Sequence, residues 1–432
     1  MTKKKVNLIT LGCSKNLVDS ERVLKQLEDA GFETVHDSED DSDIVVINTC
    51  GFIGDAKEES IETILQAVSM KTDGRISQIY VMGCLSERYR VDLQKEIPEV
   101  DKWYGKFDWV GLVEDLTLKS NSKNYSQERV ITTPSHYTYL KIAEGCNRFC
   151  SFCAIPLITG RFKSRPIEDI INEVRHLVGC GVKEFNVIAQ DLSSYGIDIY
   201  GEMALPRLVD KMAQVEGVKW IRLHYAYPAQ FPIELLNVME KHKNVCRYLD
   251  IALQHVSDKV LKNMRRHITG AETRELLNKI RKAVPGIHIR TTLMVGFPGE
   301  GEAEFEELKN FVKEQRFDRM GAFAYCEEED TYGAKNFKDD ISQEEKERRL
   351  DEIMNLQEQI SLEHNQQKVG NEFEVVIDRE DADYYVGRTE FDSPEVDPEV
   401  LIEKTQELGI GNFYKVKITQ AMPFELIAEL KK

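Results

Sequence analysis

The first 130 residues alternate short apolar runs with longer stretches in which apolar residues recur every three or four positions. A short apolar run indicates a strand, and the longer period indicates an amphipathic helix. The predicted strands cover residues 6–11, 44–47 and 79–82, and the predicted helices cover residues 17–27 and 56–70. Because strands that alternate with helices form parallel sheets, this region predicts a parallel α/β domain.

From about residue 137 to residue 330 the same strand-then-helix unit repeats six times. The predicted strands cover residues 139–143, 185–189, 220–225, 248–253, 287–295 and 320–325. A TIM barrel closes with eight such units, so six units predict an open, partial (β/α)6 barrel. Functional groups of such barrels lie at the carboxyl ends of the strands.

The chain ends in two further patterns. Residues 342–368 are highly charged with apolar residues on one side, which predicts a bridging helix. Residues 369–432 contain short alternating runs separated by glycines, which predicts a small antiparallel β-barrel. We therefore divide the chain into an N-terminal α/β domain (1–130), a partial barrel (131–340), a bridging helix (341–367) and a β-barrel (368–432).

Composition narrows the class of protein. Of the 432 residues, 41% are hydrophobic and 31% are charged, which fits a globular chain rather than a disordered one. The 57 basic residues face 75 acidic ones, a net charge of −18, so the whole chain does not attract nucleic acid or anionic lipid and favours a basic partner. No apolar segment approaches the ~18 residues of a membrane helix, so we expect no membrane association.

The N-terminus resembles a bacterial lipoprotein signal, with three lysines and a short apolar run before Cys13. A strand followed by a helix fits better, because the run is short and contains Asn7 and Thr10. We therefore expect a cytoplasmic protein. In that reducing compartment its nine cysteines favour metal ligands or buried thiols over disulfides.

The loop after the first barrel strand contains Cys146, Cys150 and Cys153 in a CxxxCxxC spacing. Three thiolates this close can hold three irons of a four-iron, four-sulfur cubane and leave the fourth iron open. A structural zinc ion needs four ligands, and no nearby cysteine or histidine supplies the fourth. Zinc and ordinary buried thiols remain the alternatives, but this spacing before a βα repeat is typical of radical S-adenosylmethionine enzymes.

In that chemistry the open iron chelates S-adenosylmethionine, and one electron releases a 5′-deoxyadenosyl radical that removes hydrogen from an unactivated carbon. No acid-base dyad is therefore required. Four residues are candidates for contact with S-adenosylmethionine: Phe152 before the third cysteine, Gln190 and Gln254 at strand ends, and Gly296 in a Gly-Phe-Pro-Gly turn. A tight turn alone also explains Gly296, and His255, beside Gln254, has an alternative structural role.

Three further cysteines each follow a predicted strand of the first domain: Cys13, Cys50 and Cys84. One cysteine at a strand end is most often a small buried apolar residue. Neighbouring parallel strands share one carboxyl edge, however, so these three are expected to meet and to hold a second cluster. We interpret Cys180 and Cys246 as structural, whereas Cys326 ends the last barrel strand and has a pocket-facing alternative.

The order of a three-cysteine α/β domain, a CxxxCxxC partial barrel and a small β-barrel resembles the methylthiotransferase family of radical S-adenosylmethionine enzymes over essentially the whole chain. The last domain resembles a TRAM domain. The resemblance implies two 4Fe-4S clusters, ligated by the six cysteines named above. It also implies S-adenosylmethionine as radical source and methyl donor, and an electron donor such as flavodoxin or ferredoxin.

Two branches of this family differ in substrate: one modifies an adenosine of tRNA and the other an aspartate of ribosomal protein uS12. Four stretches resemble the ribosomal branch: residues 142–146, 225–228, 250–255 and 392–397. The family usually has a serine where this chain has Cys326, which puts the local loop geometry in doubt.

Charge favours the same branch. Residues 365–432 contain eight basic and fifteen acidic residues, whereas a barrel that grips RNA is expected to be basic. The predicted partner is therefore uS12 or the small ribosomal subunit. A merely solvated acidic surface, methylthiolation of tRNA and a non-enzymatic two-cluster electron carrier remain the alternatives.

Overall fold

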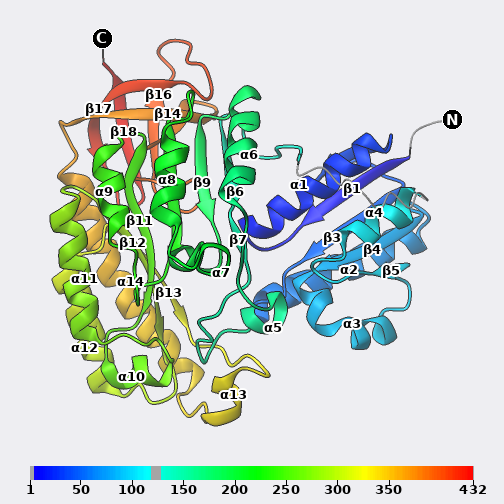
Figure 1. The fold of residues 1–432 in the computed structure, drawn as a ribbon, viewed down its shortest axis with the longest axis horizontal. Helices are drawn as coiled ribbons and strands as arrows, with labels where there is room; N and C mark the ends of the chain where they lie inside the picture. Colours follow the sequence, from blue (N-terminus) through cyan, green and yellow to red (C-terminus); the bar gives the residue numbers. More distant parts are fainter. Residues whose placement is uncertain (1–3, 118–127, 432) are drawn as a thin grey trace.

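The computed structural model describes residues 4–117 and 128–431. Figure 1 shows three units: the N-terminal unit in blue and cyan on one side, a central sheet with its helices, and a C-terminal barrel in orange and red above the central sheet. This arrangement confirms the predicted α/β fold class with an additional β-barrel.

The N-terminal unit is a five-stranded parallel sheet in the order β2-β1-β3-β4-β5. Its strands are β1 (Lys5–Thr10), β2 (Glu33–His36), β3 (Ile44–Thr49), β4 (Gln78–Gly83) and β5 (Lys102–Trp103). Its helices are α1 (Ser14–Asp29), α2 (Gly54–Thr72), α3 (Cys84–Glu96) and α4 (Trp109–Thr117). After β1 the chain goes outward to β2 and then returns to the other side as β3, so the strand order reverses between β1 and β3. Ligands of open α/β sheets bind at this switch point, outside the carboxyl ends of the strands.

The central unit is a six-stranded, fully parallel sheet in the order β13-β12-β11-β10-β9-β6. Its strands are β6 (Tyr137–Lys141), β9 (Glu184–Ile188), β10 (Trp220–Ala226), β11 (Val245–Gln254), β12 (His288–Val295) and β13 (Arg319–Ala324). The long helices around it are α6 (Ile167–Gly179), α8 (Leu205–Ala213), α9 (Glu234–Lys241), α11 (Gly270–Ala283), α12 (Glu302–Gln315) and α14 (Gln343–Gln366). Shorter elements lie in the loops: the hairpin β7 (Ala143–Glu144) with β8 (Lys163–Ser164), and α5 (Ile155–Thr159), η1 (Leu192–Ser194), α7 (Ile197–Tyr200), α10 (Asp258–Asn263) and α13 (Tyr332–Asn336).

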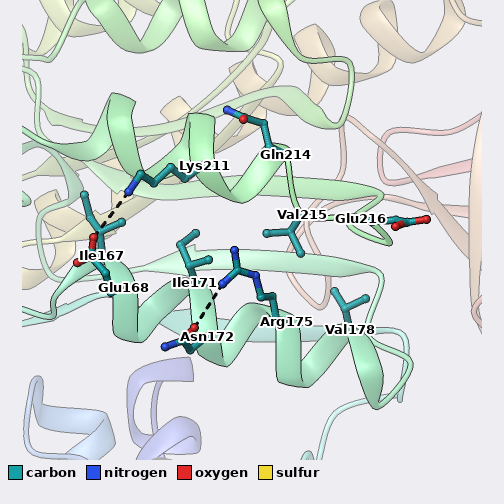
Figure 2. A pocket seen from close by; sticks show the side chains of 10 residues that line it. All are labelled: Ile167, Glu168, Ile171, Asn172, Arg175, Val178, Lys211, Gln214, Val215 and Glu216. Carbon is teal, nitrogen blue, oxygen red and sulfur yellow. Dashed lines mark hydrogen bonds and ion pairs between the residues drawn. The ribbon is translucent and has the colours of Figure 1, made fainter.

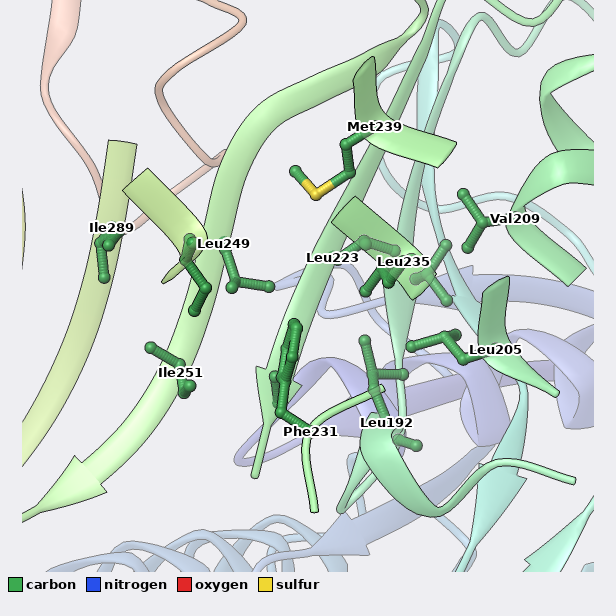
Figure 3. Close-up of a cluster of buried hydrophobic side chains, with 14 of the residues drawn as sticks. Leu192, Leu205, Val209, Leu223, Phe231, Leu235, Met239, Leu249, Ile251 and Ile289 are labelled. Carbon is green, nitrogen blue, oxygen red and sulfur yellow. The ribbon is translucent and has the colours of Figure 1, made fainter. Parts of the chain in front are cut away.

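The main hydrophobic core lies between this sheet and its helices. Figure 3 shows Leu223 and Leu249 of neighbouring strands against Leu235 and Met239 of α9. These side chains are at most 2% exposed, so the strands are rigidly backed on their outer face.

The C-terminal unit is a closed barrel in the order β14-β15-β16-β18-β17. Its strands are β14 (Glu372–Glu380), β15 (Tyr384–Thr389), β16 (Glu399–Glu403), β17 (Phe413–Ala421) and β18 (Glu425–Leu430). Four pairings are antiparallel, but β16 and β18 are parallel, which differs from the purely antiparallel barrel expected. The reason is closure: β17 pairs with β14, so the hairpin that follows brings β18 back beside β16 in the same direction.

The segment between β15 and β16, residues 390–397, packs against the inner side of the central strands. Asp392 accepts a hydrogen bond from Arg319 of β13 at 2.6 Å, and Asp397 accepts one from the Tyr248 hydroxyl of β11 at 2.8 Å. Phe391 stacks on His288 of β12, with ring centroids 4.1 Å apart. We call residues 390–397 the plug, because they pack against residues at or near the amino-terminal ends of β11, β12 and β13.

Candidate functional site

The cysteines of the N-terminal unit follow its central strands. Cys13 follows β1 and precedes α1, Cys50 directly follows β3, and Cys84 directly follows β4 as the first residue of α3. Since β1, β3 and β4 are adjacent, all three cysteines lie along one carboxyl edge, at and next to the switch point.

Glycines beside these cysteines let the three loops approach closely. A Cβ atom on Gly12, whose φ is 89°, would lie 2.8 Å from the Cys50 sulfur. A Cβ atom on Gly51 would lie 2.7 Å from the Leu85 Cα atom, and one on Gly83, with φ 102°, would lie 2.5 Å from the Thr49 carbonyl oxygen. The cradle therefore excludes any side chain larger than hydrogen at these positions, and it leaves the thiols as the groups that converge.

The electrostatic surroundings of the three thiols differ. Desolvation opposes ionisation of Cys13, but the ammonium groups of Lys15 and Lys106 hold the pKa of this thiol below its usual value. Burial raises the pKa of Cys50, and it raises the pKa of Cys84 to about 12. Iron binds thiolates, so a bound cluster would displace the protons of Cys50 and Cys84.

The second triad, Cys146, Cys150 and Cys153, lies in the loop between β7 and α5, and all three cysteines are half-buried. The Cys150 sulfur accepts a hydrogen bond from Arg266 Nη1 at 3.3 Å and lies 3.9 Å from the Tyr227 hydroxyl oxygen. Burial raises the pKa of Cys146 to about 11 and also raises that of Cys153.

Both triads fit a cluster with one open iron. All nine cysteines are free thiols, and each triad offers three sulfurs without a fourth cysteine. Within residues 4–117 and 128–431, no three His, Cys, Asp or Glu side chains are arranged to hold a single metal ion. Three thiols from one loop or one sheet edge match the three ligands of a four-iron cluster with one open iron, whereas a structural zinc ion needs a fourth ligand.

The four predicted contacts for S-adenosylmethionine have different surroundings. Phe152 packs edge-to-face on Phe297, and Gln190 Nε2 donates a hydrogen bond to Glu144 at 3.0 Å, next to the second triad. Gln254 ends β11 in a left-handed conformation with φ 70°, where strain often accompanies function. A Cβ atom on Gly296, whose φ is 74°, would lie 2.3 Å from the Lys346 Cγ atom of α14, so the backbone needs a glycine here whether or not it contacts a ligand.

A polar chain that the sequence did not predict runs from Cys84 of the first triad to Glu144, two residues before Cys146. Asn16 Oδ1 lies 3.7 Å from the Cys84 sulfur and accepts a hydrogen bond from Lys106 at 3.3 Å. Lys106 also donates to Asp19, which pairs with Lys141 at the end of β6. The chain continues through an ion pair between Lys141 and Glu144 and a hydrogen bond from Gln190 to Glu144.

This polar chain stays charged. Burial opposes ionisation of Asp19, but Lys141 and Lys106 lower the pKa of its carboxyl to about 2. The same surroundings lower the pKa of Glu144, chiefly through Lys141, and raise that of Lys106, chiefly through Asp19, although burial works against both shifts. Of this polar chain, the sequence indicated only the position at the end of β6. Asp19 and Lys106 could not be recognised, because a charged residue in a predicted helix or loop is usually exposed on the surface.

A second contact crosses the junction between the N-terminal and central units. The Lys15 ammonium group lies 3.6 Å from the ring centroid of Tyr225, the last residue but one of β10, which has a φ of 64°. Lys15 is two residues from Cys13, so this cation–π contact holds the first cysteine loop against the mouth of the partial barrel.

The remaining candidates have structural surroundings. His255 is fully buried, accepts a hydrogen bond from the Ser257 amide at 3.0 Å, and its Nε2 atom lies 3.4 Å from Glu300 without a hydrogen bond. Cys246 is buried in β11, and Cys180 is exposed at the end of α6. Cys326 is exposed and its sulfur lies near Gly54 at the start of α2, so it faces the N-terminal unit.

One cavity of about 690 Å³ lies between α6 and α8 in the outer helical layer (Figure 2). Among its lining residues, Lys211 pairs with Glu168 at 3.6 Å, and Arg175 donates a hydrogen bond to Asn172 at 3.4 Å. This cavity contains no cysteine and is not the reaction site. Across the described residues, no helix is long and apolar enough to cross a membrane.

Three family profiles match successive parts of the chain. They are described as "Uncharacterized protein family UPF0004" over residues 5–105, "Radical SAM superfamily" over residues 140–312 and "TRAM domain" over residues 369–430. Two solved structures share the fold at 14% identity: the radical S-adenosylmethionine methyltransferase TsrM from Kitasatospora setae and the cobalamin-dependent radical enzyme OxsB. The TsrM match has a TM-score of 0.54 and covers 75% of each chain, and the OxsB match has a TM-score of 0.52 and covers 83% of this chain and 56% of OxsB.

Full-length relatives are far more similar. The protein named "Ribosomal protein uS12 methylthiotransferase RimO" from Phocaeicola vulgatus is 60% identical over 432 residues, all of both chains. The protein of the same name from Bacteroides fragilis is 59% identical over the same span, and that from Christiangramia forsetii is 52% identical over 99% of this chain and 95% of its own. The chain therefore belongs to the ribosomal protein uS12 methylthiotransferase family of radical S-adenosylmethionine enzymes.

Proposed function

We propose that the protein transfers a methylthio group to the β-carbon of an aspartate side chain of ribosomal protein uS12. It uses S-adenosylmethionine as radical source and methyl donor, together with two 4Fe-4S clusters. The observation that supports this proposal most strongly is full-length identity of 60% to a protein with that name. The two cysteine triads of this chain supply the donor sets that the reaction requires.

The second triad, Cys146, Cys150 and Cys153, would hold the cluster that binds S-adenosylmethionine. The first triad, Cys13, Cys50 and Cys84, would hold the other cluster. When bound, the two groups supply a radical able to remove hydrogen from an unactivated carbon and an iron site able to bind sulfur. Phe152, Gln190, Gln254 and Gly296 stay proposed contacts of S-adenosylmethionine.

The side chains around the second triad have clear tasks. Arg266 is buried and donates to the Cys150 sulfur, which places positive charge beside a thiolate and tunes any iron bound there. Phe152, Phe297 and Tyr325 belong to an apolar cluster behind the same loop, which excludes water from it. Exclusion of water protects a reactive radical from side reactions.

The junction between the N-terminal and central units positions the two triads relative to each other. The buried chain from Asn16 through Asp19 to Glu144 joins α1 to the end of β6, and Lys15 contacts Tyr225. Buried, fully paired charges hold a single arrangement better than exposed ones, which supports transfer between two fixed centres.

The proposal includes the cellular setting. The partner is uS12, free or within the small ribosomal subunit, the electron donor is a flavodoxin or ferredoxin, and the enzyme is cytoplasmic. We also propose the division into domains at residues 1–130, 131–340, 341–367 and 368–432, which the positions of β6, α14 and β14 support.

Mass spectrometry of uS12 and of tRNA from cells that lack this gene tests the substrate. The methylthio mark on uS12 is expected to disappear, and the methylthioadenosine of tRNA is expected to stay. The reverse result would assign the chain to the tRNA branch. A complemented strain carrying the C146A variant serves as the matched control, because it contains the protein without its complete second triad.

A further inference from the structure

A cleft of about 570 Å³ lies between the N-terminal unit and the edge of the central sheet, and neither triad lines it. Its walls come from α1, the loop before α4, the hairpin β7–β8 and the start of α6. The charged side chains that line it are Arg22, Lys141, Arg161, Lys163 and Arg165 against Glu144 and Asp169. In a chain with a net charge of −18, five basic side chains beside two acidic ones make a local reversal of sign.

Arg22 points to a missing acceptor. Its residue is only 9% exposed, and its Nε and Nη2 atoms are buried without a hydrogen-bond partner. Its nearest carboxylate is that of Asp19, whose Oδ1 atom lies 4.0 Å from Nη1. A buried guanidinium that lacks acceptors is costly, so an oxyanion that enters the cleft would satisfy it.

Of the four other cationic side chains that line the cleft, two already have partners and two do not. Arg165 and Lys141 are used internally: Arg165 donates to Glu173 at 2.6 Å, and Lys141 pairs with Asp19 and Glu144. Arg161 and Lys163 are exposed, and neither has a charged or hydrogen-bonded side-chain partner within the described part of the chain. Three cations with free donors therefore face one space.

The cleft also has an aromatic wall. Phe107 is 48% exposed, and Trp109 lines the cleft beside it. An exposed aromatic ring such as that of Phe107, beside basic side chains, can stack a nucleobase while the cations hold its phosphate.

We propose that this cleft binds a phosphate group, carried either by a free nucleotide or by RNA. Arginine pairs with phosphate through two parallel hydrogen bonds, and a phosphate offers more charge and more acceptor oxygens than a single carboxylate. The RNA source alone rests on the proposed function, because an assembled ribosomal subunit presents RNA beside its proteins. The phosphate site itself does not depend on methylthio transfer.

Binding measurements on the full chain test the site. The probes are inorganic phosphate, AMP and single-stranded RNA oligomers of increasing length, each titrated at several salt concentrations. R161A/K163A is expected to weaken binding of phosphate-bearing probes about tenfold, roughly the loss of one strong charged contact. For RNA, the slope of log affinity against log salt is expected to fall by about 1.4, since each lost contact with a single-stranded phosphate contributes about 0.7.

The double variant K282A/K313A is the matched control, because both lysines are exposed on the outer helices α11 and α12. It removes the same charge and is expected to bind all probes as the unmodified chain does. R22Q is expected to weaken phosphate binding more than R161A/K163A, and a thermal melt shows whether it is folded. If R22Q is unfolded, the R161A/K163A variant still tests whether the cleft binds phosphate.

Comparison of the AMP and RNA probes distinguishes a free nucleotide from RNA as the carrier of the phosphate group. Equal affinity for AMP and for RNA oligomers identifies a small phosphate ligand, whereas affinity that rises with oligomer length identifies RNA. The proposal is overturned if R161A/K163A binds every probe as tightly as the control, or if acetate and citrate compete better than phosphate. None of these measurements requires turnover. They would therefore test the phosphate site even if the protein did not modify uS12.

Discussion

The carboxylate of Glu328, in the loop after β13, accepts a hydrogen bond from Arg88 of α3 at 2.9 Å. Lys57 of α2 donates to the same oxygen atom at 3.0 Å, and the Glu328 side chain is only 3% exposed. One buried charge thus joins the last barrel loop to two helices of the N-terminal unit, and α3 begins at Cys84. The relative position of the two triads depends on this pair of contacts as well as on the buried polar chain.

Replacing Glu328 by alanine is expected to destabilise this junction, because two cations then lose their buried partner. Breaking a buried ion pair from one side costs about 3 to 5 kcal/mol. Denaturant unfolding measures the loss, and methylthio transfer should fall more than cleavage of S-adenosylmethionine does. E327Q is the control, since Glu327 is exposed beside it, and equal behaviour of the two variants would show that the contact is not structural.

The two triads are expected to act separately. C146A/C150A/C153A should abolish reductive cleavage of S-adenosylmethionine while about half of the iron remains, because each triad supplies its own cubane. C13A/C50A/C84A should preserve formation of 5′-deoxyadenosine but stop methylthio transfer. Iron analysis and product assays measure both results, and loss of all iron in either variant would contradict independent sites.

Substituting Gly12 by alanine is expected to remove iron from the first triad only. The new methyl group would collide with the Cys50 sulfur, and the positive φ adds backbone strain. G31A is the matched control, because Gly31 has a similar φ of 95° but nothing within 4 Å of an added Cβ atom. Iron content per chain separates the effects: a comparable loss in G31A would mean that backbone strain, not the collision, disturbs the site.

The acidic barrel is expected to steer a basic partner through its exposed carboxylates. Asp378 is not one of them, because it is held internally by Arg388 at 2.6 Å and by His136 at 2.8 Å. We therefore expect E380Q/D381N/D383N to slow association with uS12 and to flatten its salt dependence, with cleavage of S-adenosylmethionine unchanged. Stopped-flow association at several salt concentrations measures this, and identical rates for variant and unmodified chain would exclude a steering role.

Acid is expected to loosen the junction through Asp19. Its folded pKa of about 2 lies below the ordinary carboxyl value, so the folded state binds its proton less tightly than the unfolded chain does. The resulting stability is fully present above about pH 4 and is lost as the pH falls from about 4 toward 2. Unfolding measured across this range should show a smaller pH dependence in D19N, and an unchanged dependence would mean that other carboxyls dominate.

Local patterns were sufficient to predict the strands and the cysteines at their ends. A period of two or of 3.6 is a property of consecutive residues, so β1, β3, β4 and all six central strands were visible in the sequence. The short strands β2 and β5 were not, since four and two residues carry too little pattern. The parallel pairing of β16 with β18 was also invisible, because it follows from closure of the barrel.

Contacts between distant segments could not be predicted. Asp19 and Lys141 are 122 residues apart, and each alone reads as a surface charge. Arg22 belongs to the polar side of a helix pattern, and only the fold shows that this side is covered. For Gly296, the sequence suggested an approach to a ligand but not the close approach of Lys346 of α14, which comes from a distant segment.

The plug has a consequence for how the chain is made. A ribosome releases residues 390–397 only after the whole central sheet, so Arg319 and Tyr248 leave the exit tunnel long before Asp392 and Asp397. During that interval the Arg319 guanidinium and the Tyr248 hydroxyl lack these hydrogen-bond acceptors, and an incompletely packed sheet is prone to misassembly. A nascent chain that stalls before the plug is therefore expected to depend on chaperones. The central unit is expected to complete its folding only after the C-terminal unit has been synthesised.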